Sequence, residues 1–192
     1  MGRSKPFGSR GSGLGGRRSN PEPPTPNPES QPPGIDYRPI DSAVEAARAL
    51  FDYAALWAPP PAFDRGWGAW VKEGWEAEGG AGDGVERLIG AILLEVAGPN
   101  GMIYGPVVAE TGNPIEIASH LLSVLLPHAQ TLGVATLFAR PQGLDRIWVR
   151  FGFIPVPEAD LPEALRGRPG AGLFGWRGGS AIWSSRKPAG YE

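Results

Sequence analysis

Two apolar runs that meet at a tight turn constrain the fold of this chain more than any other feature. RLIGAILLEVAG covers residues 87–98, GMIYGPVVAE covers residues 101–110, and Pro99-Asn100-Gly101 lies where they meet. Asn-Gly between apolar runs is a strong β-hairpin signal, because both residues tolerate the positive φ angles that a two-residue turn requires. The sequence therefore predicts two paired strands here.

A long amphipathic helix is predicted directly after the hairpin, over PIEIASHLLSVLLPHAQTLG, residues 114–133. Its apolar residues recur every three or four positions, which places them on one face. Gly133 is suited to the helix C-terminus, and Pro127 predicts a kink or an early end. The predicted buried stripe consists of Ala118, Leu121, Leu122, Leu125, Ala129 and Leu132.

The remaining segments supply strands and helices on both sides of this unit. On the amino-terminal side we expect a strand over 36–40, a helix that starts at Asp41 or Ser42, and a second helix over 62–78, where Trp67, Trp70 and Trp75 follow helical spacing. On the carboxyl-terminal side we expect a strand over 134–140, a helix over 141–152, a strand over 153–157, a turn of helix or a loop in LPEALRG, and a closing strand pair, GLFGWRG with SAIWSSR. This order predicts an α/β fold with a mixed sheet flanked by helices.

Residues 1–34 differ in composition from the rest of the chain. They contain no Val or Ile, and they are Gly/Arg-rich up to residue 20 and Pro-rich from residue 21. Such a segment buries too little apolar surface to offset its ordering entropy, so we expect a disordered tail at 1–34 and one domain at 35–192. The tail carries a net charge of +3 and the domain −5. A protein or anionic partner would therefore bind through the tail, and an acidic domain argues against nucleic-acid binding.

Several classes of protein are disfavoured by what the sequence lacks. There is no Cys and there are two His, which disfavours disulfides, a thiol nucleophile and a metal site. No apolar run is long enough to span a membrane, and no secretory signal is present, so the expected location is the cytoplasm. No pattern in the sequence indicates an oligomeric state.

Three segments together resemble the GNAT acetyltransferase superfamily, over about residues 35–186. YRPIDSAVEAARAL is similar to the opening strand and helix, the hairpin with the long helix is similar to the cofactor-binding core, and RIWVRFGFIPVP is similar to the element that ends in Gly-Phe. This resemblance implies acetyl-CoA as co-substrate and no metal. It further implies that Gly105-Pro106 marks a bulge from which the cofactor strand leaves its neighbour.

Cofactor contacts are implied at two places by the same resemblance. Backbone groups of the strand would bind the pantetheine arm, and the helix N-terminus would bind the pyrophosphate. The residues concerned are Val107, Val108, Ala109, Gly112, Asn113, Ile115, Glu116, Ile117 and Ala118.

Three positions depart from the family pattern. Asn113 stands in place of Arg or Gln, and Glu116 stands in place of the central Gly, where its carboxylate would lie near the pyrophosphate. Two like charges about 5 Å apart at an effective dielectric of about 20 repel by about 3 kcal/mol, which weakens binding roughly a hundredfold. Trp148 stands where the family often has a Tyr that protonates the departing thiolate, and an indole N–H is no acid for that step.

Glu95 and Glu110 are the candidate catalytic bases for deprotonating the amine. Glu95 lies in the first hairpin strand, either facing solvent, as is commoner, or in a cleft. Glu110 ends the second strand, where it is equally well explained as a loop or capping acid. We expect His120 to form a solvated pair with Glu116 on the helix surface and the Trp residues of 62–78 to pack in the core, although a substrate pocket or a partner surface also fits them.

The sequence thus predicts an acetyl-CoA-dependent N-acetyltransferase acting on a primary amine, in a small molecule, an amino acid or a peptide N-terminus. The alternative is a GNAT-like domain without catalysis that serves as a binding or structural subunit. A regulatory domain that binds acyl-CoA or an amino acid without turnover is a third interpretation.

Overall fold

A computed structural model describes residues 34–40, 44–56, 65–72, 85–109, 112–141, 143–168 and 182–185. Within these residues the elements, in chain order, are β1 (Ile35–Pro39), α1 (Val44–Tyr53), β2 (Arg65–Lys72), β3 (Glu86–Ala97), β4 (Asn100–Val108), α2 (Pro114–Thr131), β5 (Thr136–Ala139), α3 (Asp145–Arg150), β6 (Ile154–Val156), the 3-10 turns η2 (Glu158–Asp160) and η3 (Glu163–Leu165), and β7 (Ile182–Ser184). The predicted tail, residues 1–34, lies almost wholly outside the described residues.

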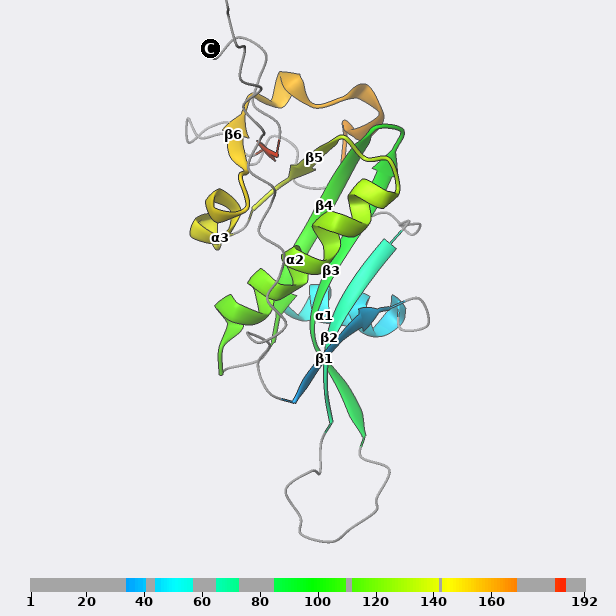
Figure 1. The fold of residues 1–192 in the computed structure, drawn as a ribbon, viewed down its shortest axis with the longest axis vertical. Coiled ribbons are helices and arrows are strands. Elements are labelled where there is room, and N and C mark those ends of the chain that lie inside the picture. Colours follow the sequence, from blue (N-terminus) through cyan, green and yellow to red (C-terminus); the bar gives the residue numbers. More distant parts are fainter. Residues whose placement is uncertain are drawn as a thin grey trace, which may run out of the picture.

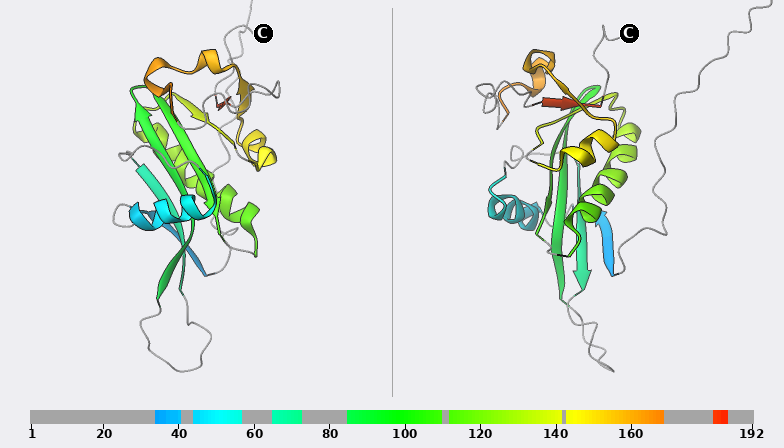
Figure 2. Two further views of the ribbon diagram at one scale, coloured as in Figure 1. Left: turned by 180° about the vertical axis from the view of Figure 1, so that it is seen from behind. Right: turned by 90° about the vertical axis from the view of Figure 1, so that its left-hand side faces the viewer.

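The strands form one mixed sheet in the order β1-β2-β3-β4-β5-β7-β6 (Figure 1). Every neighbouring pair is antiparallel except β4 and β5, which run parallel because α2 connects them. Helix α2 crosses one face of the sheet and α1 covers the other, as the turned view shows (Figure 2). The predicted α/β fold, a mixed sheet flanked by helices, is confirmed.

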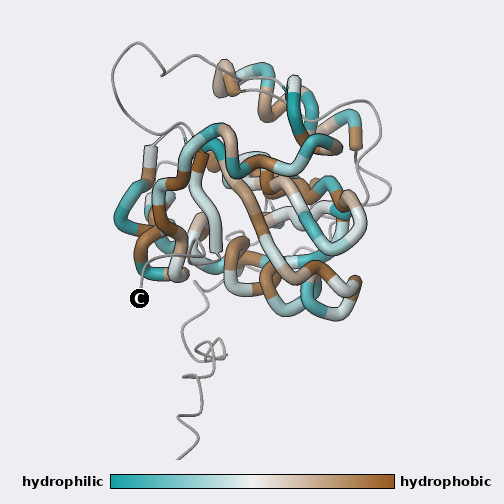
Figure 3. The backbone as a smooth tube through the Cα atoms, turned by 90° about the horizontal axis from the view of Figure 1, so that it is seen from above, coloured by the Kyte–Doolittle hydropathy of each residue, from teal (hydrophilic) through white to brown (hydrophobic). Residues whose placement is uncertain are grey.

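A separate apolar cluster fills each side of the sheet. The side under α2 holds Leu121, Leu122 and Leu125, and the side under α1 holds Phe51 and Met102. Both helices carry apolar and polar residues in alternation along the chain (Figure 3), as expected of helices with one buried face. Strands β3 and β4 lie between the two clusters and are buried along most of their length.

The hairpin of β3 and β4 is confirmed, but its turn lies earlier than predicted. Ala97 pairs with Asn100, so the two turn residues are Gly98 and Pro99, and Asn100 begins β4. Gly98 has a φ of +61°, which glycine adopts without a side-chain penalty. Glycine at the first of two turn positions is a common hairpin solution, and here it took precedence over the Asn-Gly pair.

The helix predicted over 62–78 is wrong for its described part, because Arg65–Lys72 is a strand. Trp67 packs against the cluster under α2 and Trp70 against the cluster under α1. Their three-residue spacing therefore reflects a strand with two buried faces. Side chains added at Gly66 or Gly68 would collide with Ile40, so these glycines allow close packing in the sheet. Trp75 lies outside the described residues.

Helix α2 follows its prediction closely and continues past Pro127 to Thr131. Pro127 removes one backbone donor, a loss of about 3 kcal/mol in a free helix. Leu125 and Ala129, on either side of it, are fully buried against the sheet, and this packing holds the helix together. The described part of the closing pair, β7, pairs with β5 and β6; the GLFGWRG segment lies outside the described residues.

Candidate functional site

Strands β4 and β5 separate partway along the sheet. Their pairing runs from Asn100 with Thr136 to Ile103 with Ala139, where β5 ends while β4 continues to Val108. At the same level the β3–β4 register shifts between Ala91 and Leu93, which confirms the bulge predicted at Gly105-Pro106. A Cβ on Gly105 would lie 2.9 Å from the Val107 nitrogen, so only glycine fits this bulge.

The backbone of β4 beyond the bulge faces two ways. The Ala109 N–H donates to the Ile89 oxygen at 2.8 Å, and the Val107 oxygen lies near Gly90, so both residues bond toward β3. Because backbone groups alternate along a strand, the N–H and C=O of Val108 point toward the opening left by β5. Of the three strand residues predicted to contact the cofactor, Val108 thus presents its polar backbone groups to that opening.

A cleft that is open to solvent lies at the point of separation and is called the apex cleft below. Met102 to Pro106 of β4 line it, together with Leu144 at the N-cap of α3 and Trp148 within α3. Its polar lining residues are Tyr104, Arg140 and Arg168. Its lining residues are Leu56, Met102, Ile103, Tyr104, Gly105, Pro106, Arg140, Gly143, Leu144, Trp148 and Arg168.

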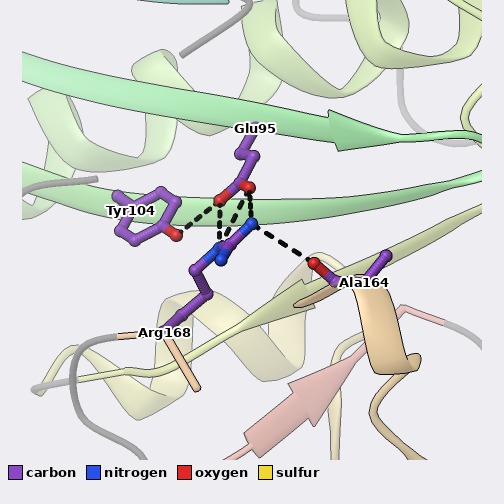
Figure 4. Close-up of polar contacts among 4 residues, drawn as sticks. All are labelled: Glu95, Tyr104, Ala164 and Arg168. Atoms are coloured by element: carbon purple, nitrogen blue, oxygen red, sulfur yellow. Dashed lines mark hydrogen bonds and ion pairs between the residues drawn. The ribbon is translucent and has the colours of Figure 1, made fainter. Parts of the chain in front are cut away.

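Glu95, Tyr104 and Arg168 form a bonded group beside this cleft (Figure 4). The Tyr104 hydroxyl donates to Glu95 Oε2 at 2.8 Å, while Arg168 donates through Nε at 3.0 Å and through Nη2 at 2.5 Å. Arg168 Nη2 also donates to the Ala164 carbonyl at 3.2 Å. Burial first, and then the bond to Glu95, raise the pKa of Tyr104 above its ordinary value, so Tyr104 is a neutral donor.

The position of Glu95 corrects the favoured prediction that it faces solvent. Glu95 is 9% exposed and lies on the face of the sheet that carries Leu93, Met102 and Tyr104. A carboxylate is rarely buried without a cation, and Arg168 supplies it from 73 residues away in the sequence. Because the Arg168 guanidinium and the Tyr104 hydroxyl both donate to it, the Glu95 carboxylate is fixed in place beside the cleft but does not line it.

Arg140, the residue directly after β5, brings a second guanidinium group to the cleft. It donates to the two carboxylate oxygens of Glu158 at 2.9 Å and 2.5 Å, which is the two-pronged geometry that arginine favours. The Arg140 side chain is 8% exposed and that of Glu158 is 46% exposed. In both ion pairs the arginine therefore lines the cleft and the carboxylate lies away from it.

The first turn of α2 makes the second half of the predicted cofactor site. Asn113 Oδ1 accepts the Glu116 N–H at 3.3 Å, and the Asn113 amide donates to the Glu116 carboxylate. Asn113 thus caps the helix through its side-chain oxygen, and its side-chain amide also holds the Glu116 carboxylate beside the same terminus. Pro114 has no N–H, and the Ile117 N–H bonds to the Asn113 carbonyl, so within this turn Ile115 keeps an N–H for a ligand.

The other residues predicted to contact the cofactor differ in their exposure to solvent. Ile115 is 59% exposed and Gly112 is exposed, whereas the side chains of Ile117 and Ala118 pack in the cluster under α2. The second candidate base, Glu110, lies outside the described residues. Asn113 to Glu116, together with Gly112, thus form a solvent-facing helix start, called the α2 cap below.

His120 does not form the solvated pair that the sequence predicted. It is 7% exposed, and its ring centroid lies 4.3 Å from that of Tyr37 on β1. Burial lowers the pKa of His120, and the nearby Glu116 opposes this shift, so the ring is neutral near pH 7. His120 is a packing residue between α2 and β1, on the side of the sheet away from Glu95.

Trp148 occupies the position at which the family often has a tyrosine. It is 1% exposed, and its ring stacks edge-to-face on Phe153 with centroids 4.9 Å apart. Among the described residues no group of three or more acids or histidines could hold a metal ion, and no helix is long and apolar enough to cross a membrane.

No protein-family model and no curated protein matches this sequence. Solved structures do match it. N-acetylglutamate synthase from Neisseria gonorrhoeae, complexed with coenzyme A and L-arginine, has a TM-score of 0.52 at 19% identity over 79% of this chain and 33% of that chain. An acetyltransferase of the GNAT family from Staphylococcus aureus Mu50 has a TM-score of 0.50 at 9% identity over 78% and 97% of the two chains.

These comparisons establish the fold. The chain has the GNAT fold, as the three sequence segments predicted. It spans about a third of the length of the N-acetylglutamate synthase chain.

Proposed function

We propose that this protein is an acetyl-CoA-dependent N-acetyltransferase that transfers an acetyl group to a primary amine. The observation that carries the proposal is the position of the apex cleft, where β4 leaves β5 at a bulge. A thioester arm that bonds to the free backbone of Val108 would lead into this cleft. The neighbouring N-acetylglutamate synthase was solved with coenzyme A, which supports the same class of co-substrate.

The residues present offer acetyl-CoA a partial fit. The backbone groups of Val108 suit the pantetheine arm, and the apolar wall of Met102, Leu144 and Trp148 suits an acetyl group. The α2 cap offers the pyrophosphate the Ile115 N–H and the helix dipole, against the opposing charge of Glu116. We therefore expect the protein to bind acetyl-CoA, but weakly.

Acetyl-CoA supplies an activated acyl carbon, and the protein needs only to hold an amine beside it and remove a proton. The nitrogen becomes strongly acidic as it bonds to that carbon, so a weak base suffices. In our proposal the Tyr104 hydroxyl accepts this proton while it passes its own to Glu95, and Arg168 holds the carboxylate in line. The carbon–sulfur bond of the thioester breaks as the amide forms, and CoA leaves as a thiolate that takes a proton from water. Glu110 remains a second candidate base.

The second candidate function is a GNAT-like domain without catalysis, serving as a binding or structural subunit. Its support is the capping of the α2 terminus by Asn113 and Glu116, together with Trp148 at the usual tyrosine position. The basic and then Pro-rich tail would suit a tether to a protein or anionic partner, as the sequence predicted.

Turnover separates these two functions. Acetyl-CoA is incubated with a panel of primary amines, and release of the free thiol is followed with a colorimetric reagent. We expect release with at least one amine, with kcat reduced by about a hundredfold or more in Glu95→Gln and in Tyr104→Phe. Glu163→Gln is the matched control, because Glu163 is an exposed acid away from the cleft. If none of the amines in the panel leads to release of the thiol, the second function is favoured.

A further inference from the structure

Among the described residues, the polar side chains that line the apex cleft are two guanidinium groups and one phenol. Arg140 and Arg168 line it, while their carboxylate partners, Glu158 and Glu95, do not. The acids balance the guanidinium charges and fix their orientation through hydrogen bonds. A ligand in the cleft therefore meets cationic groups first, and these favour a ligand that carries a negative charge.

Arg168 keeps donors for such a ligand. Its hydrogen bonds to Glu95 and Ala164 use Nε and Nη2, so within the part of the chain that the structure describes none of these bonds involves the two N–H groups of Nη1. The side chain is 30% exposed, so a ligand can reach it while the ion pair with Glu95 remains intact. A carboxylate is planar and accepts from guanidinium N–H groups with good geometry.

Arg168 and Tyr104 lie side by side, because both donate to the same oxygen, Oε2 of Glu95. A ligand whose amine bonds to the Tyr104 hydroxyl and whose carboxylate bonds to Arg168 must have these two groups close together. One carbon atom between amine and carboxylate meets this condition, whereas a long spacer does not. The apolar wall formed by Leu56, Leu144 and Trp148 would then take a side chain.

We infer that the acetyl acceptor is an α-amino acid with an apolar side chain, whose carboxylate binds Arg168 and whose amine binds Tyr104. The inference rests on the proposed N-acetyltransferase function for the acceptor role, but the binding itself requires no turnover. It narrows the acceptor from primary amines in general to amines with an adjacent carboxylate.

Calorimetry of matched ligands tests the inference. L-leucine, L-methionine and L-phenylalanine are titrated into the full chain, each beside its α-amide, which keeps the amine and the side chain but loses the charge. We expect each acid to bind about tenfold to a hundredfold more tightly than its amide, as a charged hydrogen-bonded pair predicts. The amide carries the less basic amine, so a preference for the acid cannot come from the fraction of neutral amine.

Variants identify the residue responsible for this preference. Arg168→Gln should abolish the preference for the acids, and Arg168→Lys should retain part of it. Glu95→Gln/Arg168→Gln, which leaves no unpaired buried carboxylate, should behave like Arg168→Gln if the fold is kept. Arg150→Gln removes the same charge from the exposed end of α3 and should leave the preference unchanged.

Three results would overturn the inference, and the first two are equal binding of acids and amides and a preference that survives in both Arg168→Gln variants. Absence of any binding by the acids at millimolar concentration would also overturn it. A parallel titration with acetyl-CoA keeps the two proposals apart. Acetyl-CoA binding without a preference for the acids refutes the acceptor alone, whereas a preference without acetyl-CoA binding refutes the proposed enzyme alone.

Discussion

The two ends of the opening between β4 and β5 are built in opposite ways. At the apex cleft, side chains from three separate parts of the chain meet, and Glu95, Tyr104 and Arg168 bond to one another around an open space. At the α2 cap, the polar groups come from four consecutive residues and bond mainly among themselves. The apex cleft thus depends on the tertiary fold, which brings separate parts of the chain together, whereas the α2 cap depends on neighbouring residues alone.

This difference shows which end of the proposed site is ready to bind a ligand and which end is not. The apex offers donors and a phenol to a ligand without first breaking a bond. The cap must give up its Asn113 contact before the Glu116 N–H can bind a phosphate, and the Glu116 carboxylate repels that phosphate. In the proposed enzyme, the end of the site that would bind the acceptor is therefore better formed than the end that would bind the pyrophosphate.

The largest expected effect comes from emptying the apex wall. Trp148→Ala removes a ring that is 1% exposed and packs on Phe153, and we expect the free energy of unfolding to fall by about 3–5 kcal/mol. Ile115→Ala, at the 59% exposed position of the cap, should change it by less than about 0.5 kcal/mol. Urea unfolding followed by circular dichroism measures both. Equal losses would refute the contrast between the two ends.

Loss of a single hydroxyl at the apex should have the next largest effect. Tyr104→Phe leaves the Glu95 carboxylate with one donor fewer, and we expect a loss of about 1.5–3 kcal/mol, as for hydrogen bonds to charged groups. The same substitution at Tyr37 is the matched comparison, because the Tyr37 hydroxyl is buried without a hydrogen-bond partner among the described residues. Tyr37→Phe should be neutral or stabilising in the same urea experiment.

The cap contributes less to stability. Asn113→Ala removes the side-chain bond to the Glu116 N–H, and we expect the free energy of unfolding to fall by about 1 kcal/mol. Asn113→Asp keeps an acceptor at the same position and should recover stability, except for the repulsion between two adjacent carboxylates. A loss above about 3 kcal/mol for Asn113→Ala would show that the cap carries tertiary structure.

The smallest effect appears only at high pH. Burial and the charge of Glu116 raise the pKa of Tyr37 to about 12, above the value near 10 in the unfolded chain. Below pH 10 the phenol is neutral in both states, and as the pH rises from 10 to about 12 the unfolded chain ionises first, so the free energy of unfolding falls over this range. Tyr37→Phe should lose the phenolate absorbance step near pH 12, seen at ultraviolet wavelengths. A step near pH 10 in the wild type, lost in Tyr37→Phe, would refute the burial of Tyr37.

The sequence predicted those elements whose pattern has a single structural explanation. The apolar stripe of α2 repeats over five turns, and the hairpin runs pair with each other directly, so both are confirmed. Strand β2 was mistaken for a helix because it is buried on both faces, and its apolar residues then lose the alternation that marks an ordinary strand. Local spacing alone could not separate these two structures.

The α2 cap was predictable from the sequence and the apex cleft was not, because a local sequence pattern carries information only about local contacts. Asn113 and Glu116 are three residues apart, and the signature of a helix start is local. Glu95 is buried because Arg168, 73 residues later, comes to lie beside it, and no local pattern contains that information. The bulge at Gly105-Pro106 was the one sequence signal for the apex cleft. It indicated where the cleft lies but not that Arg140 and Arg168 line it.

Calorimetric titration of acetyl-CoA into the wild type and into Glu116→Gly is the most direct test of the central claim, that this fold still binds an acyl donor. We predict binding by the wild type at millimolar ligand and binding up to about a hundredfold tighter by Glu116→Gly, because the carboxylate near the pyrophosphate is gone. Glu116→Gln, which removes the charge but keeps the side chain, should fall between them. No binding by the wild type at millimolar acetyl-CoA would contradict the proposed enzyme.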